Sequence, residues 1–490
     1  MTTVTAVRLP KTTSEQVRPL WMNRMVSDIR CDRAEPTSGR VCPGWTGYSV
    51  PLRRALQSGV KGVGTPKRIV IVGGGFAGFN AARALIRALP PDTEVVLVNK
   101  TDYFLYLPLL PQVAAAALDP RRVAVSLTKA LPRVRLALGT ADKVSVDRRE
   151  LTYTDPEGSS HTVGYDRLVL AAGSVNKLLP IPGVGVHAHG FRSIAEALYL
   201  RDHVIRQIEL AGATQDPALR DARCTFVVVG AGYTGTEVAA QGPPFTAAVA
   251  GAYAALSSQR IRWLLVDVAP KVLPELDPRL SRAADRLLRR RGVEVLTGTS
   301  VREATGEGVL LTTGEFIPSR TLAWCVGVRP DPLTDATGLP TQGGRLVVDT
   351  TLAVPGHPEI FACGDCAAVP DLTRQGELTA MTAQHATRQG RLAGRNVAAS
   401  LGHGRAGEYR HHDLGFVVDF GGLQAAANPL GVPLSGLPAA VVTRGYHLAA
   451  MPGNRARILV DWAVDAVVGR QTVQLGLVRS GDVPLDTARP

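Results

Sequence analysis

The chain carries one local pattern twice: an apolar strand, a G-x-G-x-x-G loop and a helix. The first copy leads from Arg68–Val72 into Gly73-Gly74-Gly75-Phe76-Ala77-Gly78 and a helix over 76–89. The second leads from Thr225–Val229 into Gly230-Ala231-Gly232-Tyr233-Thr234-Gly235 and a helix from about residue 234. Another apolar strand follows each helix, at 94–98 and 261–266. This alternation predicts an α/β fold with two Rossmann-like dinucleotide-binding domains.

Each glycine in such a loop has a physical role. The first permits a tight turn, the second lets the backbone approach a pyrophosphate, and the third lets helix and strand pack closely. The helix that follows directs its free N–H groups at the phosphates. We therefore expect dinucleotide contacts at both loops, from Gly73, Gly75, Phe76, Ala77 and Gly78 in the first copy and Gly230, Gly232, Tyr233, Thr234 and Gly235 in the second.

A polar residue ends the second strand of each copy. In the first copy it is Asn99, where an acid is usual, although an amide can still accept a hydrogen bond from a ribose hydroxyl. In the second copy it is Asp267, whose carboxylate suits the 2′-hydroxyl of NADH and would repel the 2′-phosphate of NADPH. More residues separate Asp267 from the second glycine loop than the roughly 20 that are common in such units. We expect the extra segment to begin where Gly242-Pro243-Pro244 breaks the second helix.

Two complete dinucleotide units imply electron relay between two nucleotides. A flavin is the partner that accepts a hydride and passes electrons on singly or in pairs. We therefore expect FAD in the first unit and NADH in the second.

The charge and composition of the chain limit the kinds of partner that it can bind. The formal net charge is +13 with a pI near 9.8, yet aromatic residues are only 5%, which argues against a nucleic-acid partner. Two explanations of the positive charge remain: a composition that is simply rich in arginine, and a preference for an anionic membrane surface. No apolar run reaches about 18 residues, so we expect peripheral membrane contact only.

The six cysteines form no disulfide framework. Cys363 and Cys366 lack a second ligand pair, which favours packed thiols over a redox or metal site, and we expect no metal ion.

Composition and pattern divide the chain into five parts. We expect a disordered basic extension at 1–66, with a short helix around 21–29. An FAD-binding domain follows in two segments, 67–190 and 345–402, on either side of an NAD-binding domain at 191–344. The regular alternation of strands and helices ends near residue 402, so we expect 403–490 to form an α+β C-terminal region.

Several motifs resemble the type II NADH dehydrogenases (NADH:quinone oxidoreductases), which are two-dinucleotide-domain flavoproteins. They are Leu107-Pro-Leu-Leu-Pro-Gln-Val-Ala114 beside the flavin, Tyr165 to Ser174, Phe361-Ala-Cys-Gly-Asp-Cys-Ala367 and Val272-Leu-Pro-Glu-Leu-Asp277. The resemblance implies that Asp365 binds the ribityl side of the flavin. An Asx-turn role is the alternative. It also assigns Lys100, Gly173 and Ala383 to FAD and Gly327 to NAD.

The acceptor site is implied by Ala383-Gln384-His385-Ala386-Thr387-Arg388, which resembles the A-Q-x-A-x-Q quinone motif of that family. Gln384 can donate to a quinone carbonyl, and Arg388 replaces the second glutamine. His385 is a proton source or, more commonly, a helix-surface histidine. Glu237 matches a family residue near nicotinamide and quinone, or is a first-turn acid complementing the helix dipole.

The resemblance further implies a peripheral enzyme on the cytoplasmic face of the membrane. An apolar stretch at 458–468, with Trp462 and flanking arginines, suits an interfacial helix; packing on the protein's own core is the alternative. Two other functions remain open: a soluble NAD(P)H:acceptor flavin reductase, and a redox-sensing flavoprotein similar to apoptosis-inducing factor. A homodimer is also open.

Overall fold

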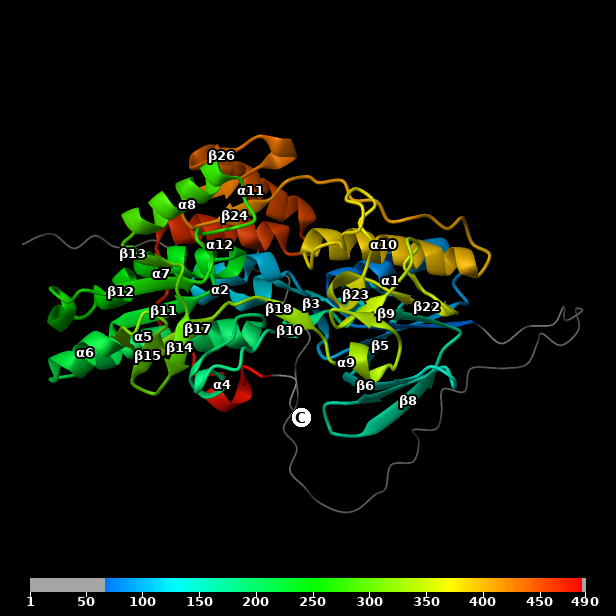
Figure 1. Cartoon of the computed structure of the whole chain (residues 1–490), viewed down its shortest axis with the longest axis horizontal. Coiled ribbons are helices and arrows are strands. Elements are labelled where there is room, and N and C mark those ends of the chain that lie inside the picture. The colour runs from blue at the N-terminus through cyan, green and yellow to red at the C-terminus, as the bar shows by residue number, and fades with distance from the viewer. Residues whose placement is uncertain (1–66, 487–490) are drawn as a thin grey trace, which may run out of the picture. The chain divides into compact units, whose positions relative to one another are not determined.

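The computed structural model describes residues 67–486, so the expected extension and the helix around 21–29 lie outside the described residues. Within this range the predicted fold class is confirmed. Two separate, mainly parallel sheets each carry helices, and a smaller α+β region follows them (Figure 1).

The first unit is built on a six-stranded sheet of order β21-β22-β9-β1-β2-β5. Its strands are β1 (Arg68–Val72), β2 (Glu94–Asn99), β5 (Arg135–Leu138), β9 (Arg167–Leu170), β21 (Ala353–Val354) and β22 (His357–Ala362). The central strand β1 is apolar and buried from Ile69 to Val72, as parallel strands covered on both faces are. Because β22 pairs in parallel with β9, the chain returns to this sheet after the second unit.

The second unit repeats the same order with β13-β12-β11-β17. These strands are β11 (Thr225–Val229), β12 (Arg262–Asp267), β13 (Val293–Thr297) and β17 (Thr321–Trp324). In each unit a three-stranded antiparallel sheet precedes an equivalent strand, β9 in the first unit and β17 in the second. The first is β6 (Thr140–Ser145), β7 (Glu150–Thr154) and β8 (Ser160–Gly164); the second is β14 (Val301–Ala304), β15 (Gly308–Leu311) and β16 (Phe316–Pro318). The duplication read from two glycine loops therefore extends through the whole unit.

The two glycine loops have the same local geometry. Gly73 and Gly230 adopt φ of +93° and +106°, a backbone region that favours glycine. A Cβ on Gly78, in α1 (Phe76–Ala88), would lie 1.8 Å from Gly73 O. A Cβ on Gly235, in α7 (Tyr233–Ala250), would lie 1.8 Å from Gly230 O. Each helix therefore begins in backbone contact with its own loop.

The expected break at Gly242-Pro243-Pro244 is wrong, because α7 continues through both prolines to Ala250. Pro244 cannot donate to Ala240 O, and Arg291 Nη1 supplies that hydrogen bond instead, at 2.8 Å. The Thr246 hydroxyl donates to Gly242 O at 3.1 Å. Part of the extra length before Asp267 is therefore helical: α7 has 18 residues where α1 has 13.

The C-terminal region packs on helices of both units. It contains β24 (Val417–Asp419), β25 (Ala425–Ala427), β26 (Leu434–Ser435), α11 (Leu437–Ala450) and α12 (Arg455–Val467). Contacts run from these strands to α7 and to α8 (Pro278–Arg290). Trp462 is buried and donates to Gln112 Oε1 at 2.6 Å, from α12 to α2 (Leu110–Ala114). The interfacial placement expected for Trp462 is wrong, since this indole finds its partner inside the protein.

Helix α12 nevertheless has two faces. Ile458 and Trp462 point inward, and Asp461 accepts a hydrogen bond from Arg122 Nε at 2.9 Å. On the other side an apolar face is exposed, formed by Leu459, Val460, Val464 and Val467. Among the described residues no helix is long and apolar enough to span a membrane.

Helix α10 (Ala383–Ser400) crosses α1 on the first sheet at a contact between backbones (Figure 1). A Cβ on Gly390 would lie 2.0 Å from Ala77 O. We predict that Gly390→Ala lowers the free energy of unfolding by about 1–3 kcal/mol through overpacking. The matched control is Gly445→Ala on α11, where nothing lies within 4 Å of an added Cβ. That change should stabilise by up to about 1 kcal/mol. Denaturant unfolding measures both, and equal effects would contradict the prediction.

Candidate functional site

The first unit contains a cavity of about 380 Å³ at the carboxyl ends of its parallel strands. This is the edge where ligands bind in open α/β sheets. Gly73, Asn99 and Lys100, all expected at the FAD site, line it together. The start of α5 (Ile194–Ala213) forms another part of the wall, through Ser193 and Glu196.

Asn99 and Asp267 occupy equivalent positions and do the same structural work. Asn99 Oδ1 accepts a hydrogen bond from Gly74 N at 2.7 Å. Asp267 Oδ2 accepts one from Ala231 N, the equivalent residue of the second loop, and its Oδ1 accepts one from Ala269 N at 2.7 Å. Each side chain therefore holds the second residue of its own glycine loop.

A half-buried cation beside the cavity supports an anionic ligand. Arg192 lines the cavity, and within residues 67–486 its buried Nη1 has no hydrogen-bond partner. Its Nη2 donates to Ser174 Oγ at 3.1 Å, and Ser174 donates to Asp365 Oδ2 at 2.6 Å. Burial lowers the pKa of Arg192, whereas Asp365 opposes that shift. The diphosphate of FAD is an anion that would satisfy this guanidinium, so the residues fit the cofactor.

The turn that carries Asp365 is held from α10. Gly364 N donates to Gln389 Oε1 at 2.8 Å, and Gln389 Nε2 donates to Thr379 Oγ1 at 2.9 Å. Ala77 Cβ, at the start of α1, would lie 2.9 Å from a Cβ on Gly364. The glycine loop, the Asp365 turn and the start of α10 at Ala383 therefore converge. Gly173 is the turn after β9, and Asp331 N donates to its carbonyl at 3.1 Å.

The Cys363 and Cys366 thiols are buried around the same turn. Burial raises the pKa of Cys366 to about 11, and its Sγ donates to Leu170 O at 3.4 Å. Burial raises the pKa of the Cys363 thiol as well, so both thiols favour the neutral form.

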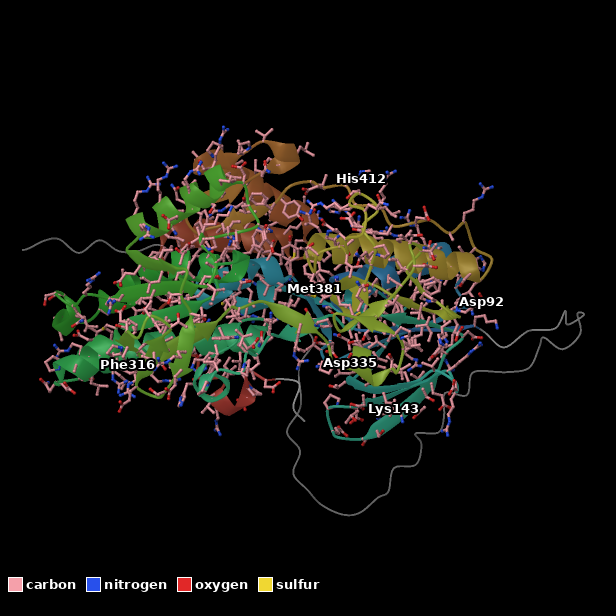
Figure 2. All side chains as sticks on the ribbon, viewed as in Figure 1. Asp92, Lys143, Phe316, Asp335, Met381 and His412 are labelled. Atoms are coloured by element: carbon pink, nitrogen blue, oxygen red, sulfur yellow. The ribbon has the colours of Figure 1, made fainter. Side chains whose placement is uncertain are left out.

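The expected quinone motif lies under the segment that follows α10. Gln384 Nε2 donates to Gly415 O at 2.5 Å, and its buried Oε1 has no partner in the described part of the chain. Arg388 Nη1 donates to the carbonyl of His412, labelled in Figure 2, and lies 3.0 Å from His411 Nδ1. The segment runs back along α10, so both side chains of the motif face it.

His385 is not the helix-surface histidine that its position suggests. It is buried, its Nδ1 lies 2.8 Å from Tyr409 Oη, and its ring stacks on His411 at 4.0 Å between centroids. Burial lowers the pKa of His385 to about 4, so the ring is neutral at physiological pH. The sequence misses this because Tyr409 and His411 come from the segment beyond α10.

Glu237 is also not a first-turn acid, because α7 has none. It is buried and its Oε1 accepts a hydrogen bond from Asp419 N at 2.8 Å. The Asp419 carboxylate accepts from Gln112 Nε2 at 2.7 Å and from Gly421 N at 2.7 Å. Sequence reasoning missed Asp419, and it named Gln112 only as part of the segment expected beside the flavin. An acid within the apolar stretch Phe416-Val-Val-Asp-Phe420 was the available signal.

A strand pair joins the second nucleotide unit to the first. Strand β10 (Ser174–Asn176) pairs with β18 (Val328–Pro330), so the chain after β9 meets the chain after β17. Gly327 precedes β18, and Lys177 N donates to its carbonyl at 3.2 Å. Tyr233 and Thr234 begin α7 after Gly232, and the Tyr233 ring lies 6.3 Å from Phe416, between centroids.

The buried carboxyl of Glu237 makes a prediction about pH. Burial, together with the charge of Asp419, raises the pKa of Glu237 well above its ordinary value. A raised pKa contributes stability that is present below the ordinary value and is lost as pH rises towards the folded pKa. Glu237→Gln has no proton to lose. We expect its free energy of unfolding, relative to wild type, to increase with pH by up to about 1.4 kcal/mol per unit.

Chemical unfolding from pH 5 to pH 9 measures this difference. The control is Glu157→Gln at an exposed turn, which should follow wild type at every pH. A Glu237→Gln difference that stays constant with pH would contradict the prediction. The groups that face Glu237 and Asp419, namely Arg291, Arg444 and Gln112, are unchanged in both variants.

Comparison with known proteins identifies the family. Residues 67–390 match the family model of the pyridine nucleotide-disulphide oxidoreductases. The chain is 34% identical over 341 residues to type II NADH:quinone oxidoreductase NdhA of Mycobacterium tuberculosis, covering 66% of this chain and 71% of that protein. It is 30% identical over 420 residues to type II NADH:quinone oxidoreductase Ndh of the same organism, covering 81% and 87%.

A solved structure has the same fold. NDH2 from Plasmodium falciparum in complex with NADH superposes with a TM-score of 0.76 at 19% identity, over 83% of this chain and 99% of that chain. The chain therefore belongs to the pyridine nucleotide-disulphide oxidoreductase family and, within it, to the type II NADH:quinone oxidoreductases.

Proposed function

We propose that this protein oxidises NADH and transfers the electrons through FAD to a quinone at a membrane surface. The observation that carries the proposal is the duplicated dinucleotide unit, with its two strand-end edges joined by the β10–β18 pair. FAD supplies the chemistry, accepting a hydride from NADH and returning two electrons to the quinone. The relatives named above, which are NADH:quinone oxidoreductases, support the same reaction.

The chain's own residues bind, orient and separate the reactants. Lys100 and Arg192 line the FAD cavity with positive charge, and Asp365 is oriented through Ser174. Asp267 presents a carboxylate at the end of β12, which favours NADH over NADPH through repulsion of a 2′-phosphate. Proximity and orientation then carry most of the rate.

Gln384 is the proposed hydrogen-bond partner of the quinone. Its side chain is part-buried and its Oε1 lacks a partner among the described residues, although its Nε2 donates to Gly415 O. A quinone carbonyl that replaced Gly415 O would accept the same N–H. Arg388 stands one helical turn further along α10 and donates to His412 O, so it orients the 411–415 segment beside the quinone.

The two half-reactions separate this role from a structural one. We predict that Gln384→Ala leaves the rate of flavin bleaching by NADH unchanged. Anaerobic reoxidation by a short-chain quinone should slow about tenfold, since one hydrogen bond is worth about 1.4 kcal/mol. Stopped-flow absorbance measures both steps. Gln375→Ala, at an exposed loop position, is the control and should alter neither.

Equal slowing of both half-reactions in Gln384→Ala would reject the assignment of Gln384. The whole proposal fails if NADH does not bleach the flavin, or if reduced protein reacts with ferricyanide but with no quinone. The latter result would favour a reductase for a soluble acceptor. A reduced flavin–nucleotide complex that persists with every acceptor would favour a redox sensor.

The surface of the C-terminal region supports peripheral binding to a membrane, and we propose the cytoplasmic face as the face that it binds. The exposed apolar face of α12 is accompanied by exposed Leu437 and Val441 on α11, and both helices lie on one side of the described chain (Figure 1). Arg455 and Arg457 at the start of α12 are exposed and suit anionic headgroups.

We predict that Val467→Glu weakens binding to phosphatidylglycerol vesicles about tenfold, because a valine side chain leaves the membrane and a charge takes its place. Val467 is 85% exposed at the end of α12. Val186→Glu is the matched control, since Val186 is 79% exposed in α4 (Val184–His187), outside the C-terminal region. Cosedimentation measures both variants. Loss of binding in both, or in neither, would count against this membrane face.

A further inference from the structure

The chain beyond α12 leaves the C-terminal region and returns to the first nucleotide unit. We call residues 471–486 the tail. It contains no helix or strand except a short 3₁₀ turn at Ser480–Asp482. Figure 1 shows its last part, in red, beside α4 and away from α11 and α12. A segment with so little structure of its own must be fixed by contacts with the rest of the protein.

The first set of contacts fixes the middle of the tail to α5. Leu475 N and Gly476 N both donate to Asp202 Oδ2, at 3.0 and 2.8 Å. The other oxygen of Asp202 is paired with Arg201 at 3.0 Å, and both side chains are buried. Gln474 adds contacts to Arg206 Nε at 3.2 Å and to Glu209. Two backbone amides on one buried carboxylate define the position of the tail along α5.

The second set of contacts fixes the end of the tail beside the FAD cavity. Leu485 is 2% exposed and belongs to a buried cluster that includes Val184 and Trp324. Asn176 Nδ2 donates to Leu485 O at 3.4 Å and to Glu196 Oε1 at 3.2 Å, so one amide joins the tail to the start of α5. Glu196 itself lines the cavity.

Between these two anchors the tail forms part of the cavity itself. Asp482, Val483 and Pro484 line it, together with Asn99 and Lys100 at the end of β2. Val483 is 7% exposed, and Asp482 Oδ2 accepts a hydrogen bond from Arg479 N at 2.8 Å within its own turn. This hydrogen bond holds the turn in shape, and the turn places Val483 and Pro484 in the wall of the cavity.

We propose that the tail is a cofactor-retaining element, which forms one wall of the FAD cavity and must detach before FAD is released. The tail and FAD then stabilise each other. If docking of the tail tightens FAD binding, bound FAD must strengthen docking of the tail by the same factor. The proposal rests on FAD as the occupant of the first unit and is independent of the quinone step.

Two leucines of the tail provide a matched pair of variants. Leu485 is 2% exposed and anchors the tail, whereas Leu477 is 71% exposed. We expect Leu485→Ala to release FAD several-fold faster than wild type and Leu477→Ala to release it at the wild-type rate. A chain that ends after Arg470 should release FAD at least tenfold faster. Fluorescence of free flavin after dilution of the holoprotein measures release, and circular dichroism checks that each variant is folded.

Hydrogen exchange on the full-length protein tests the reciprocal effect without any substitution. Amides 475 and 476 should exchange at least several-fold more slowly with FAD bound than after FAD removal. Exchange that is equal in the two forms would overturn the proposal, even if the shortened chain fails to fold. Wild-type release rates in folded Leu485→Ala and in the shortened chain would also overturn it. Slow flavin reoxidation by quinone, with FAD retained, would count against the proposed function alone.

Discussion

The contact between each glycine loop and the helix that follows it is the constraint on which the rest of the structure depends. In both units the third glycine lies so close to the carbonyl of the first that no side chain fits, 1.8 Å from an added Cβ in each case. The first glycine is confined from the other side, with Ala171 O or Cys325 O 2.3 Å from an added Cβ. Three backbone segments therefore meet at one point. This contact fixes the strand end, the helix N-terminus and the turn after the neighbouring strand, which together create a dinucleotide site.

The C-terminal region then depends on buried polar groups to join the two units. Asp419 on β24 accepts from Gln112, on a helix of the first unit, and its own backbone amide donates to Glu237 on α7. Trp462 donates to the free oxygen of the Gln112 amide. Burying such groups is costly unless each finds a partner, so they specify one docking position more than they add stability. The relative position of the flavin and nicotinamide sites is therefore tied to the same region that exposes the proposed membrane face.

The sequence predicts those features that short-range physics determines. The strands Arg68–Val72 and Thr225–Val229 are confirmed residue for residue. They could be predicted because a run of apolar, mostly β-branched residues before a glycine loop is typical of a buried strand. The errors share a different origin. Helix α7 survives two prolines because Arg291 reaches Ala240 O. His385 and Trp462 are buried because Tyr409 and Gln112 lie beside them. None of these partners is visible in the local sequence, and the roles assigned to individual site residues stay predictions.

The difference between Asn99 and Asp267 follows from the work that each residue does. Both hold the second residue of their loop through one oxygen, and an amide performs that task as well as a carboxylate. The negative charge of a carboxylate, in addition, repels a 2′-phosphate. In the proposed reaction NADH exchanges in every turnover and competes with NADPH, which gives a charge at the end of β12 a use in the second unit. FAD carries no 2′-phosphate, so an FAD site in the first unit has no such group to reject. Arg192 and the residues of the tail line the cavity of the first unit, where we propose that they help to retain FAD.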